Sequence, residues 1–196
     1  MIEYNKEIMR KIIHISSLWI PILYLYNNTA VMLKILFPLT IIAIIIEIVR
    51  KYSYKFNNLI SSILGQIMRD GEKNANSFAG ATHLFMSSTL TIAFFSKEIA
   101  IFALLVLVIS DTCAALVGRK LGWIKIYDKS LIGSLSFAIS AIFIYYYVID
   151  VHNFNLSLTQ SMIAIFAGTM AELFAKKISL DDNFAIPLAI SIILVW

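Results

Sequence analysis

The sequence predicts an all-α protein: a polytopic membrane helix bundle of about seven transmembrane helices with a cytoplasmic amphipathic helix. Composition is the first reason, because 60% of the 196 residues are apolar, only 14% are charged, and the mean hydropathy is +0.83. A soluble domain of this length could not bury so much apolar surface. The second reason is that long apolar segments recur along the whole chain. We therefore expect a single integral membrane domain over residues 1–196.

Seven apolar segments are found in windows of about 19 residues. They lie near residues 12–26, 31–49, 79–95, 98–117, 131–149, 158–175 and 184–196. No small-residue cleavage site follows the first segment, so we interpret it as a retained helix and not as a signal peptide. The last segment is shorter than the roughly 20 residues needed for a full crossing. We expect it to be tilted, partial or re-entrant.

The extended polar stretch near residues 50–78 contains apolar side chains at helical spacing. They are Leu59, Ile60, Ile63, Leu64, Ile67 and Met68. This pattern predicts an amphipathic helix on the cytoplasmic membrane surface, broken at Asp70-Gly71.

Basic residues indicate the orientation of the bundle. Alternation of the seven segments puts 14 of the 16 Lys and Arg residues on one side, and only Lys34 and Lys97 opposite. The 14 are Lys6, Arg10, Lys11, Arg50, Lys51, Lys55, Arg69, Lys73, Arg119, Lys120, Lys125, Lys129, Lys176 and Lys177. The positive-inside rule makes that side cytoplasmic, with the N-terminus inside. For most of these cations, setting topology and contacting lipid headgroups is a sufficient role. A nucleic-acid partner is not expected, because no soluble basic surface or aromatic platform accompanies the net charge of +4.

Asp111 is an acidic residue within an apolar segment. A carboxylate inside a membrane span is costly unless it is paired or bound to a metal, so it marks a candidate functional site. A stripe of small residues extends from it at helical spacing: Ala114, Ala115, Gly118 and Gly122. Small side chains permit either close helix packing or close approach of a ligand to the backbone, and the sequence leaves both open.

Three further groups fall on the same predicted face. Arg10, Lys11 and His14 share neighbouring parts of one helical face and could bind phosphate; the alternative is a topogenic pair with an interfacial histidine. Lys129 and Ser130 precede the fifth segment, where Ser130 could cap a helix whose N–H groups would face an anion. Capping alone explains Ser130 and Asp128 but not Lys129.

The third of these groups is acidic. Glu172 lies in the sixth segment, and Asp181 and Asp182 precede the last one, which has Pro187 in its early turns. One interpretation is ordinary capping of the last helix. The other is a carboxylate pair that coordinates Mg²⁺, which prefers oxygen ligands and is usually held by one or two carboxylates with substrate phosphates. The two interpretations are compatible.

Five motifs in order resemble the CTP-dependent lipid kinases, a family that includes dolichol kinase, phytol kinase and the CTP-using diacylglycerol kinase. The motifs are Arg10-Lys11-x-x-His14, Gly80-Ala81-Thr82, Asp111-x-x-Ala-Ala-x-x-Gly118-Arg119-x-x-Gly122, Lys129-Ser-Leu-x-Gly133-Ser134 and Asp181-Asp182-Asn183-x-x-x-Pro187. The resemblance implies transfer of the γ-phosphate of CTP to the hydroxyl of a membrane lipid alcohol, either diacylglycerol or a polyprenol, dolichol or phytol type of isoprenoid.

The resemblance and the chemistry of phosphoryl transfer together imply the roles of individual residues. We expect catalytic roles for Asp111, Lys129 and Asp182, and Mg²⁺ binding by Asp111, Asp181 and Asp182. We expect nucleotide binding by Arg10, Lys11, His14, Gly118, Arg119, Gly122, Ser130 and Gly133. Two positions depart from the family pattern: Ile132 stands where the family usually has Glu, and His83 where an aromatic often follows Gly-Ala-Thr. The first removes a candidate acid, so its role would fall to the aspartates.

Two alternatives stay open. A phosphatidate cytidylyltransferase would share the CTP site, but the chain lacks the long C-terminal signature by which those synthases resemble one another. A small transporter or scaffold could use Glu47 and Glu172 with Asp111 as an ion pathway. Against this, the charges gather at one surface, and Glu47 near Arg50 is more simply an interfacial ion pair. The sequence does not determine which lipid is the acceptor, which residue is the catalytic base, or what the oligomeric state is.

Overall fold

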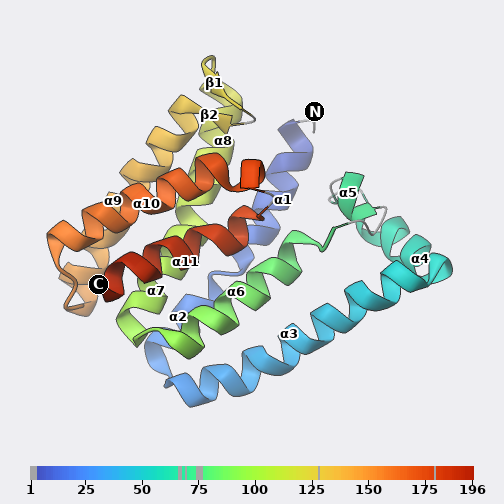
Figure 1. The fold of residues 1–196 in the computed structure, drawn as a ribbon, viewed down its shortest axis with the longest axis horizontal. Helices are drawn as coiled ribbons and strands as arrows, with labels where there is room; N and C mark the ends of the chain where they lie inside the picture. The colour runs from blue at the N-terminus through green and yellow to red at the C-terminus, as the bar shows by residue number, and fades with distance from the viewer. Residues whose placement is uncertain (1–3, 66–67, 69, 74–76, 128, 179) are drawn as a thin grey trace.

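The protein is all-α, as predicted, and 84% helical. The computed structural model describes residues 4–65, 68, 70–73, 77–127, 129–178 and 180–196, with the elements arranged as in Figure 1. The α-helices are α1 Tyr4–Ser16, α2 Trp19–Tyr26, α3 Thr29–Tyr52, α4 Tyr54–Leu64, α5 Asp70–Lys73, α6 Gly80–Phe94, α7 Lys97–Leu105, α8 Asp111–Leu121, α9 Leu131–His152, α10 Leu158–Phe174 and α11 Asp182–Val195. A π-helical segment Val106–Ser110 joins α7 to α8, and a 3₁₀ turn Ala175–Ile178 follows α10. Strands β1 Lys125–Ile126 and β2 Lys129–Ser130 form a small antiparallel hairpin before α9.

Each of the seven predicted apolar segments is helical, but their lengths differ. Four helical stretches are long and apolar enough to cross a membrane: Glu7–Tyr26, Thr29–Tyr52, Lys97–Leu121 and Leu131–His152. By contrast, α6, α10 and α11 have 15, 17 and 14 residues. At about 1.5 Å per residue, such helices reach only about 21–26 Å, less than the roughly 30 Å of a hydrocarbon core. The chain is a membrane protein with several apolar helices, and a count of seven crossings stays a prediction.

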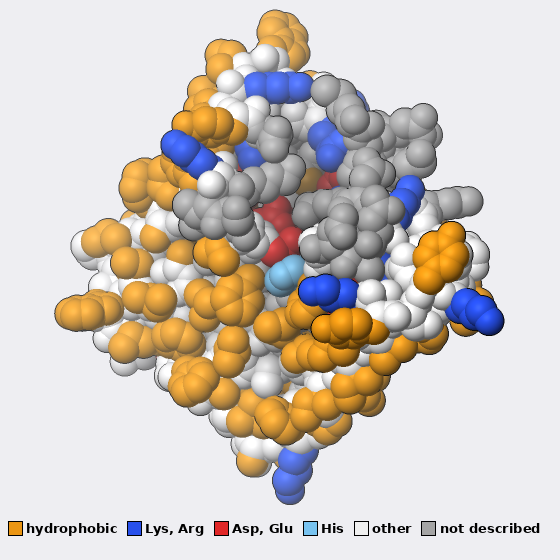
Figure 2. Space-filling view, turned by 45° about the vertical axis from the view of Figure 1, so that its right-hand side comes forward, with side chains coloured by type: hydrophobic (Ala, Val, Ile, Leu, Met, Phe, Trp, Pro, Cys, Tyr) orange, Lys and Arg blue, Asp and Glu red, His pale blue; other side chains and the backbone are white. Residues whose placement is uncertain are grey.

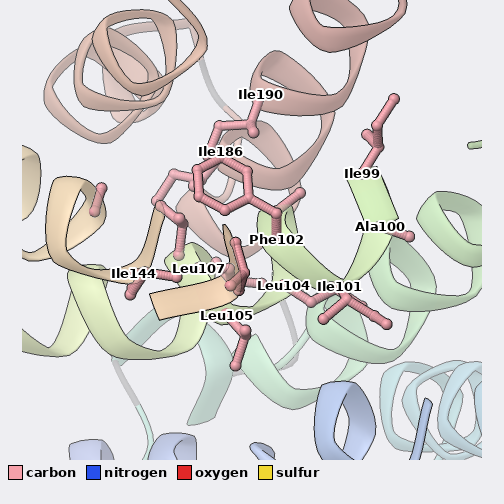
Figure 3. Close-up of a cluster of buried hydrophobic side chains, with 14 of the residues drawn as sticks. Ile99, Ala100, Ile101, Phe102, Leu104, Leu105, Leu107, Ile144, Ile186 and Ile190 are labelled. Atoms are coloured by element: carbon pink, nitrogen blue, oxygen red, sulfur yellow. The ribbon is translucent and has the colours of Figure 1, made fainter. Parts of the chain in front are cut away.

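The stretch Lys97–Leu121 forms the centre of the bundle. Its residues from Ile99 to Val108 are all buried, as a helix that is apolar on every side requires. Figure 3 shows Phe102 and Leu107 of this stretch beside Ile144 of α9 and Ile186 of α11. Helix α8 continues this buried helical stretch and begins at Asp111. The packing of the core therefore fixes the position of Asp111.

Helix α3 lies at the edge of the bundle and packs mainly on α6 (Figure 1). Much of its surface is apolar and exposed, including Ile41, Ile42 and Ile45. Such a surface is expected where a helix faces lipid and not water.

The predicted amphipathic helix corresponds in part to α4. Ser53 caps this helix by accepting a hydrogen bond from the Phe56 N–H, and Leu59, Ile63 and Leu64 are exposed along it. The helix ends at Leu64, and the expected breakpoint Asp70-Gly71 instead begins the short helix α5. Ile67 and Arg69 lie outside the described residues. A location of α4 on the cytoplasmic membrane surface stays a prediction.

Charge is distributed unevenly over the surface. Figure 2 shows most of the Lys and Arg side chains of this face around its upper half, while hydrophobic side chains cover the lower half. This distribution agrees with the charge asymmetry along the sequence. The side chains of Lys6 and Lys176 lie outside the part of the structure described, and the assignment of the charged side to the cytoplasm stays a prediction.

Candidate active site

Asp111 is held at a break in helical geometry. The π-helical segment Val106–Ser110 directly precedes it, and π turns within α-helices occur frequently at functional sites. Asp111 is only 2% exposed. Its Oδ2 atom accepts a hydrogen bond from Lys11 Nζ in a buried ion pair. His14 Nε2 lies 3.6 Å from the same oxygen and 3.4 Å from the Leu107 carbonyl of the π segment. The residues predicted from two distant motifs therefore meet.

The other oxygen of Asp111 has a different environment. Asp111 Oδ1 is buried and accepts no hydrogen bond from any group that the structure describes. A buried carboxylate oxygen without a partner is costly. This oxygen could therefore bind a cation or accept a hydrogen bond from a hydroxyl donor.

Helix α1 positions its cations by helical spacing. Glu7, Lys11 and His14 follow one another at intervals of four and three residues, so they share the face that packs on α8. Glu7 is buried, and its Oε2 atom lies 2.9 Å from Arg119 Nη2 and 3.6 Å from Arg10 Nη1. The two predicted arginines are thus brought together by Glu7, which is not among the site residues expected from the sequence. Glu7 precedes Lys11 by four residues, and this helical spacing is the sequence signal that places both side chains on one face.

The β1–β2 hairpin places Lys129 next to two further acids, Glu172 and Asp182. Lys129 Nζ lies 2.8 Å from Glu172 Oε1 and 3.0 Å from Asp182 Oδ2. Glu172 also accepts a hydrogen bond of 3.0 Å from Ser134 Oγ of α9. Burial by itself lowers the pKa of Lys129, but the carboxylates of Asp182, Asp111 and Glu172 outweigh it and raise the pKa above its ordinary value. Lys129 is therefore firmly protonated at neutral pH.

Asp111 and Asp182 both act on Lys129 and form one electrostatic unit with it, and Glu7 with its two arginines adjoins this unit through Lys11 of the same helix α1. We name this unit, together with the adjoining group, the Asp111 site. Four cations in it face four carboxylates: Arg10, Lys11, Arg119 and Lys129 against Glu7, Asp111, Glu172 and Asp182. Figure 2 shows acidic side chains and a histidine together near the middle of this face, where the charged upper half meets the hydrophobic lower half.

The small residues of the predicted nucleotide motifs serve packing between α8 and α9. A Cβ atom on Gly118 would lie 2.6 Å from Ser130 Oγ, and one on Gly133 would lie 2.8 Å from the Ala114 carbonyl oxygen. Gly122 also lies directly against Ser130. The packing interpretation is thus confirmed for Gly118 and Gly122, and Gly133 packs in the same contact. A contact between their backbone and a nucleotide stays a prediction.

Two of the predicted caps are present. Ser130 Oγ accepts a hydrogen bond of 3.0 Å from the Gly133 N–H at the start of α9, and Asp181 Oδ1 accepts one of 3.0 Å from the Asn183 N–H at the start of α11. Asp128 lies outside the described residues. A metal-binding role for Asp181 stays a prediction beside its capping role.

The acids near Lys129 come from α10 and α11, not from the Lys129–Ser134 motif. Ile132 occupies the position at which the family usually has Glu, and it is 36% exposed. Glu172 instead supplies a buried carboxylate to Lys129. Glu172 is not among the site residues expected from the sequence, because nothing in its local sequence shows which loop it contacts.

A second charged cluster lies where α3, α4, α5 and α6 meet, and we name it the Arg50 cluster. Arg50 is buried and donates to both carboxylate oxygens of Glu47, at 3.1 and 2.9 Å. It also donates to the Glu72 carbonyl at 2.6 Å and to Asn57 Oδ1. The expected ion pair of Glu47 with Arg50 is confirmed.

The Arg50 cluster explains the Gly80-Ala81-Thr82 motif. Glu47 accepts hydrogen bonds from the Ala79 N–H and from Thr82 Oγ1, and Glu72 accepts one from the Gly80 N–H. Carboxylates are favourable at a helix N-terminus because they satisfy its free N–H groups. Asn183 then joins this helix end to α11 by donating to the Gly80 carbonyl at 3.3 Å.

The donor set of the Asp111 site fits a hard cation held together with phosphate. Asp111 has a buried free oxygen, and carboxylate oxygens are the ligands Mg²⁺ prefers. In the described part of the chain, no group of three or more His, Cys, Asp or Glu residues is placed to hold a metal. An ion at this site would therefore need oxygens from its substrate.

A membrane helix bundle with clustered cations and carboxylates at one end is suited to a reaction that handles phosphate at the bilayer surface. The chain belongs to the CTP-dependent lipid kinase family. It is 30% identical to the CTP-dependent diacylglycerol kinase 1 of Saccharomyces cerevisiae over 95% of this chain and 71% of that protein. It is 33% identical to the Schizosaccharomyces pombe protein of the same name, over 67% of this chain and 65% of that one.

A bacterial relative extends the similarity. An uncharacterised protein of Rickettsia prowazekii is 31% identical over 95% of this chain and 92% of its own length. No protein-family model matches the chain, and no solved structure does.

Proposed function

We propose that this protein transfers the γ-phosphate of CTP to the hydroxyl of a membrane lipid alcohol, with diacylglycerol as the favoured acceptor. Lipid kinase activity with CTP follows from the family. The choice of diacylglycerol rests on the names of the yeast relatives. The observation that carries the proposal is the buried ion pair of Lys11 with Asp111, in one electrostatic unit with Lys129 and Asp182.

Without nucleotide, the cations and carboxylates of the Asp111 site neutralise one another. A triphosphate offers oxygens that are better partners for Lys and Arg than a shared carboxylate, because phosphate presents several acceptors to each cation. On this proposal, Lys11 and Lys129 exchange Asp111 and Asp182 for phosphate oxygens when CTP binds. Arg10 and Arg119, which contact Glu7 in the structure, would bind the same phosphates.

Once Lys11 and Lys129 contact phosphate, the carboxylates of Asp111 and Asp182 are available for a second role. Asp111 or Asp182 would hold Mg²⁺, with Asp181 as a further candidate, and the ion would supply neutralisation of the phosphate charge. The relevance of Asp111 is supported by its free Oδ1 atom. Whichever of Asp111 and Asp182 is not engaged in this way would orient or deprotonate the lipid hydroxyl.

The lipid would reach the site sideways from the membrane. Asp111 belongs to a stretch that is apolar and long enough to span, so a lipid alcohol in the bilayer could approach it from the side. The cytoplasmic leaflet is the side implied by the positive-inside rule.

A radiolabel assay tests the proposal. Purified protein receives Mg²⁺, γ-labelled CTP and, separately, diacylglycerol, polyprenol, phytol and farnesol, and the lipids are separated by thin-layer chromatography. We expect label in diacylglycerol and loss of label with Asp111→Asn. Absence of transfer to every lipid, together with a folded Asp111→Asn variant that behaves like the parent, would refute it.

A further inference from the structure

A cavity of about 400 Å³ lies between α10 and α11. Met170, Ala171 and Phe174 form one wall, and Phe184, Leu188 and Ala189 form the other. All the side chains that line it are apolar. Its volume falls in the range of small-molecule sites, and its lining offers no partner to a polar ligand. We name it the α10–α11 groove.

The groove is continuous with surface that suits lipid. Along α10, the exposed residues Ile163 and Phe166 lie on the helical stripe that continues to Met170. Along α11, Ile192 and Val195 continue the stripe of Leu188 and are also exposed. An apolar chain could therefore pass from the groove directly into the surrounding hydrocarbon without crossing a polar surface.

One end of the groove lies beside the β1–β2 hairpin, which also carries Lys129 of the Asp111 site. Phe174 lies two residues after Glu172, and Phe184 lies two residues after Asp182, so both walls come from helices that also carry site acids. The hairpin closes the same end, because the Tyr127 ring meets the Phe174 ring edge-on at a centroid distance of 6.0 Å. Lys129 follows Tyr127 by two residues.

Tyr127 has a backbone conformation that is unfavourable for its residue type. Its φ of 56° is in the left-handed region, which a bulky side chain rarely adopts. Besides Phe174, the ring contacts Lys177, whose Nζ atom lies 3.0 Å from the tyrosine hydroxyl and 5.0 Å from the ring centroid. These contacts fix the hairpin that carries Lys129 to the end of the groove.

We propose that the α10–α11 groove binds the part of one hydrocarbon chain of the lipid acceptor that is nearest its headgroup. This inference rests on the proposed function. A chain seated beside Met170 and Leu188 would place its ester end at Phe174 and Tyr127, and its hydroxyl towards Lys129 and Asp182. The outer part of the chain would continue along the exposed faces of α10 and α11. The groove would thus select an alcohol with an attached lipid chain over a water-soluble one.

Filling the groove tests this role by kinetics. Ala189→Phe puts a large side chain into the space, and Ala93→Phe makes the same change at an exposed position of α6. We expect Ala189→Phe to raise the KM for diacylglycerol in mixed micelles by roughly tenfold or more, with the KM for CTP unchanged. The Ala93 variant should match the parent. Equal KM values for diacylglycerol in all three proteins would overturn the proposal.

Photolabelling of the parent protein tests the same point without a variant. The probe is a diacylglycerol with a photoreactive group on an acyl carbon near the ester, compared with a phosphatidylcholine that has the same acyl chain. We expect the diacylglycerol to label residues 170–175 or 184–189, and excess diacylglycerol to prevent this labelling. Label elsewhere, or equal labelling by phosphatidylcholine, would show that the groove holds only bulk lipid.

The two proposals can fail separately. If the parent transfers phosphate from CTP but the groove is not labelled, only the groove assignment is wrong. If the groove is labelled by diacylglycerol but CTP yields no phosphorylated lipid, the kinase proposal is wrong and the lipid site stands.

Discussion

The Asp111 site and the Arg50 cluster are both buried groups of charged residues, but their polar atoms are used differently. In the Arg50 cluster, the guanidinium donates from Nε and both Nη atoms, and the acids around it accept from the backbone of α6. In the Asp111 site, Asp111 Oδ1 lacks a hydrogen-bond partner among the described residues. Lys11, Arg119 and Lys129 contact acids from other elements of the chain.

We propose that this difference separates structural charge from functional charge. A buried ion pair whose remaining donors and acceptors are satisfied by the backbone fixes one arrangement of helices. A cluster of ion pairs between side chains, with an unused carboxylate oxygen, can exchange partners when a charged ligand arrives. We therefore assign the Arg50 cluster to the scaffold and the Asp111 site to chemistry, and the following variants test that division.

Asp111→Asn should have the largest effect on activity. The change removes the charge that faces Lys11 and His14 and a candidate ligand for Mg²⁺, while its size is nearly the same. We expect kcat/KM for lipid phosphorylation to fall by about 10²–10³-fold, the loss typical for a group that stabilises charge in a transition state. Steady-state kinetics in micelles measures it. A variant within twofold of the parent would remove Asp111 from the mechanism.

Arg50→Met should affect stability and leave the chemistry intact. It leaves Glu47 buried without its cation, and breaking one side of a buried pair costs about 3–5 kcal/mol. Unfolding in detergent, followed by circular dichroism, measures the loss. The folded fraction should keep the parent's KM for CTP. If stability is unchanged and CTP binding is lost, the two regions have been assigned the wrong way round.

Glu172→Gln should have an intermediate effect. Glutamine can still accept from Ser134, but Lys129 loses one of its two close carboxylates. Because Lys129 would then be less well positioned, we expect a decrease in kcat of roughly tenfold with a smaller change in the KM for diacylglycerol. Glu98→Gln is the matched control, since Glu98 accepts from the Asn155 N–H away from the site. Equal kinetics for both variants would exclude a positioning role for Glu172.

Gly118→Ala should reduce stability by overpacking the contact of α8 with α9. Its Cβ would lie 2.6 Å from Ser130 Oγ and 3.2 Å from Gly133 Cα. Overpacking typically costs about 1–3 kcal/mol, whereas Gly→Ala in an unhindered helix is stabilising. Thermal unfolding of this variant, of Ser130→Ala and of the double variant measures the coupling. A more stable Gly118→Ala protein would contradict the packing role.

Alkaline pH should have the smallest effect. The pKa of Lys129 is raised in the folded protein, so its ion pairs stabilise fully below the unfolded value of about 10.4 and are lost only as pH rises through the higher folded value. We expect no loss of activity from Lys129 between about pH 7 and 10. A pH–rate profile of the parent and of Lys129→Arg checks this. An alkaline decrease near pH 8 that Lys129→Arg abolishes would show that Lys129 titrates there.

The helices could be predicted because hydropathy and helical spacing are local properties of the chain. The meeting of Lys11 with Asp111, and of Lys129 with Asp182, agrees with the expectation that the motifs share one face. The π turn before Asp111 could not be predicted, because an apolar run such as Val106–Ser110 has no residue that requires it.

Other features depend on long-range packing. The contact of Glu172 with Lys129 is set by how α10 packs on α9, and the use of Glu7 by how α1 packs on α8. For the small residues, sequence left helix packing and ligand approach equally open. The distances from Gly118 to Ser130 decide that packing is one of their roles.

The most direct test of the central claim is the position of the label that the parent protein transfers from CTP to diacylglycerol. Two parallel reactions contain Mg²⁺ and either γ-labelled or α-labelled CTP. If the Asp111 site performs phosphoryl transfer to a lipid hydroxyl, only the γ-label enters the lipid. Label from the α position, or no label from either with folded protein, would contradict the account.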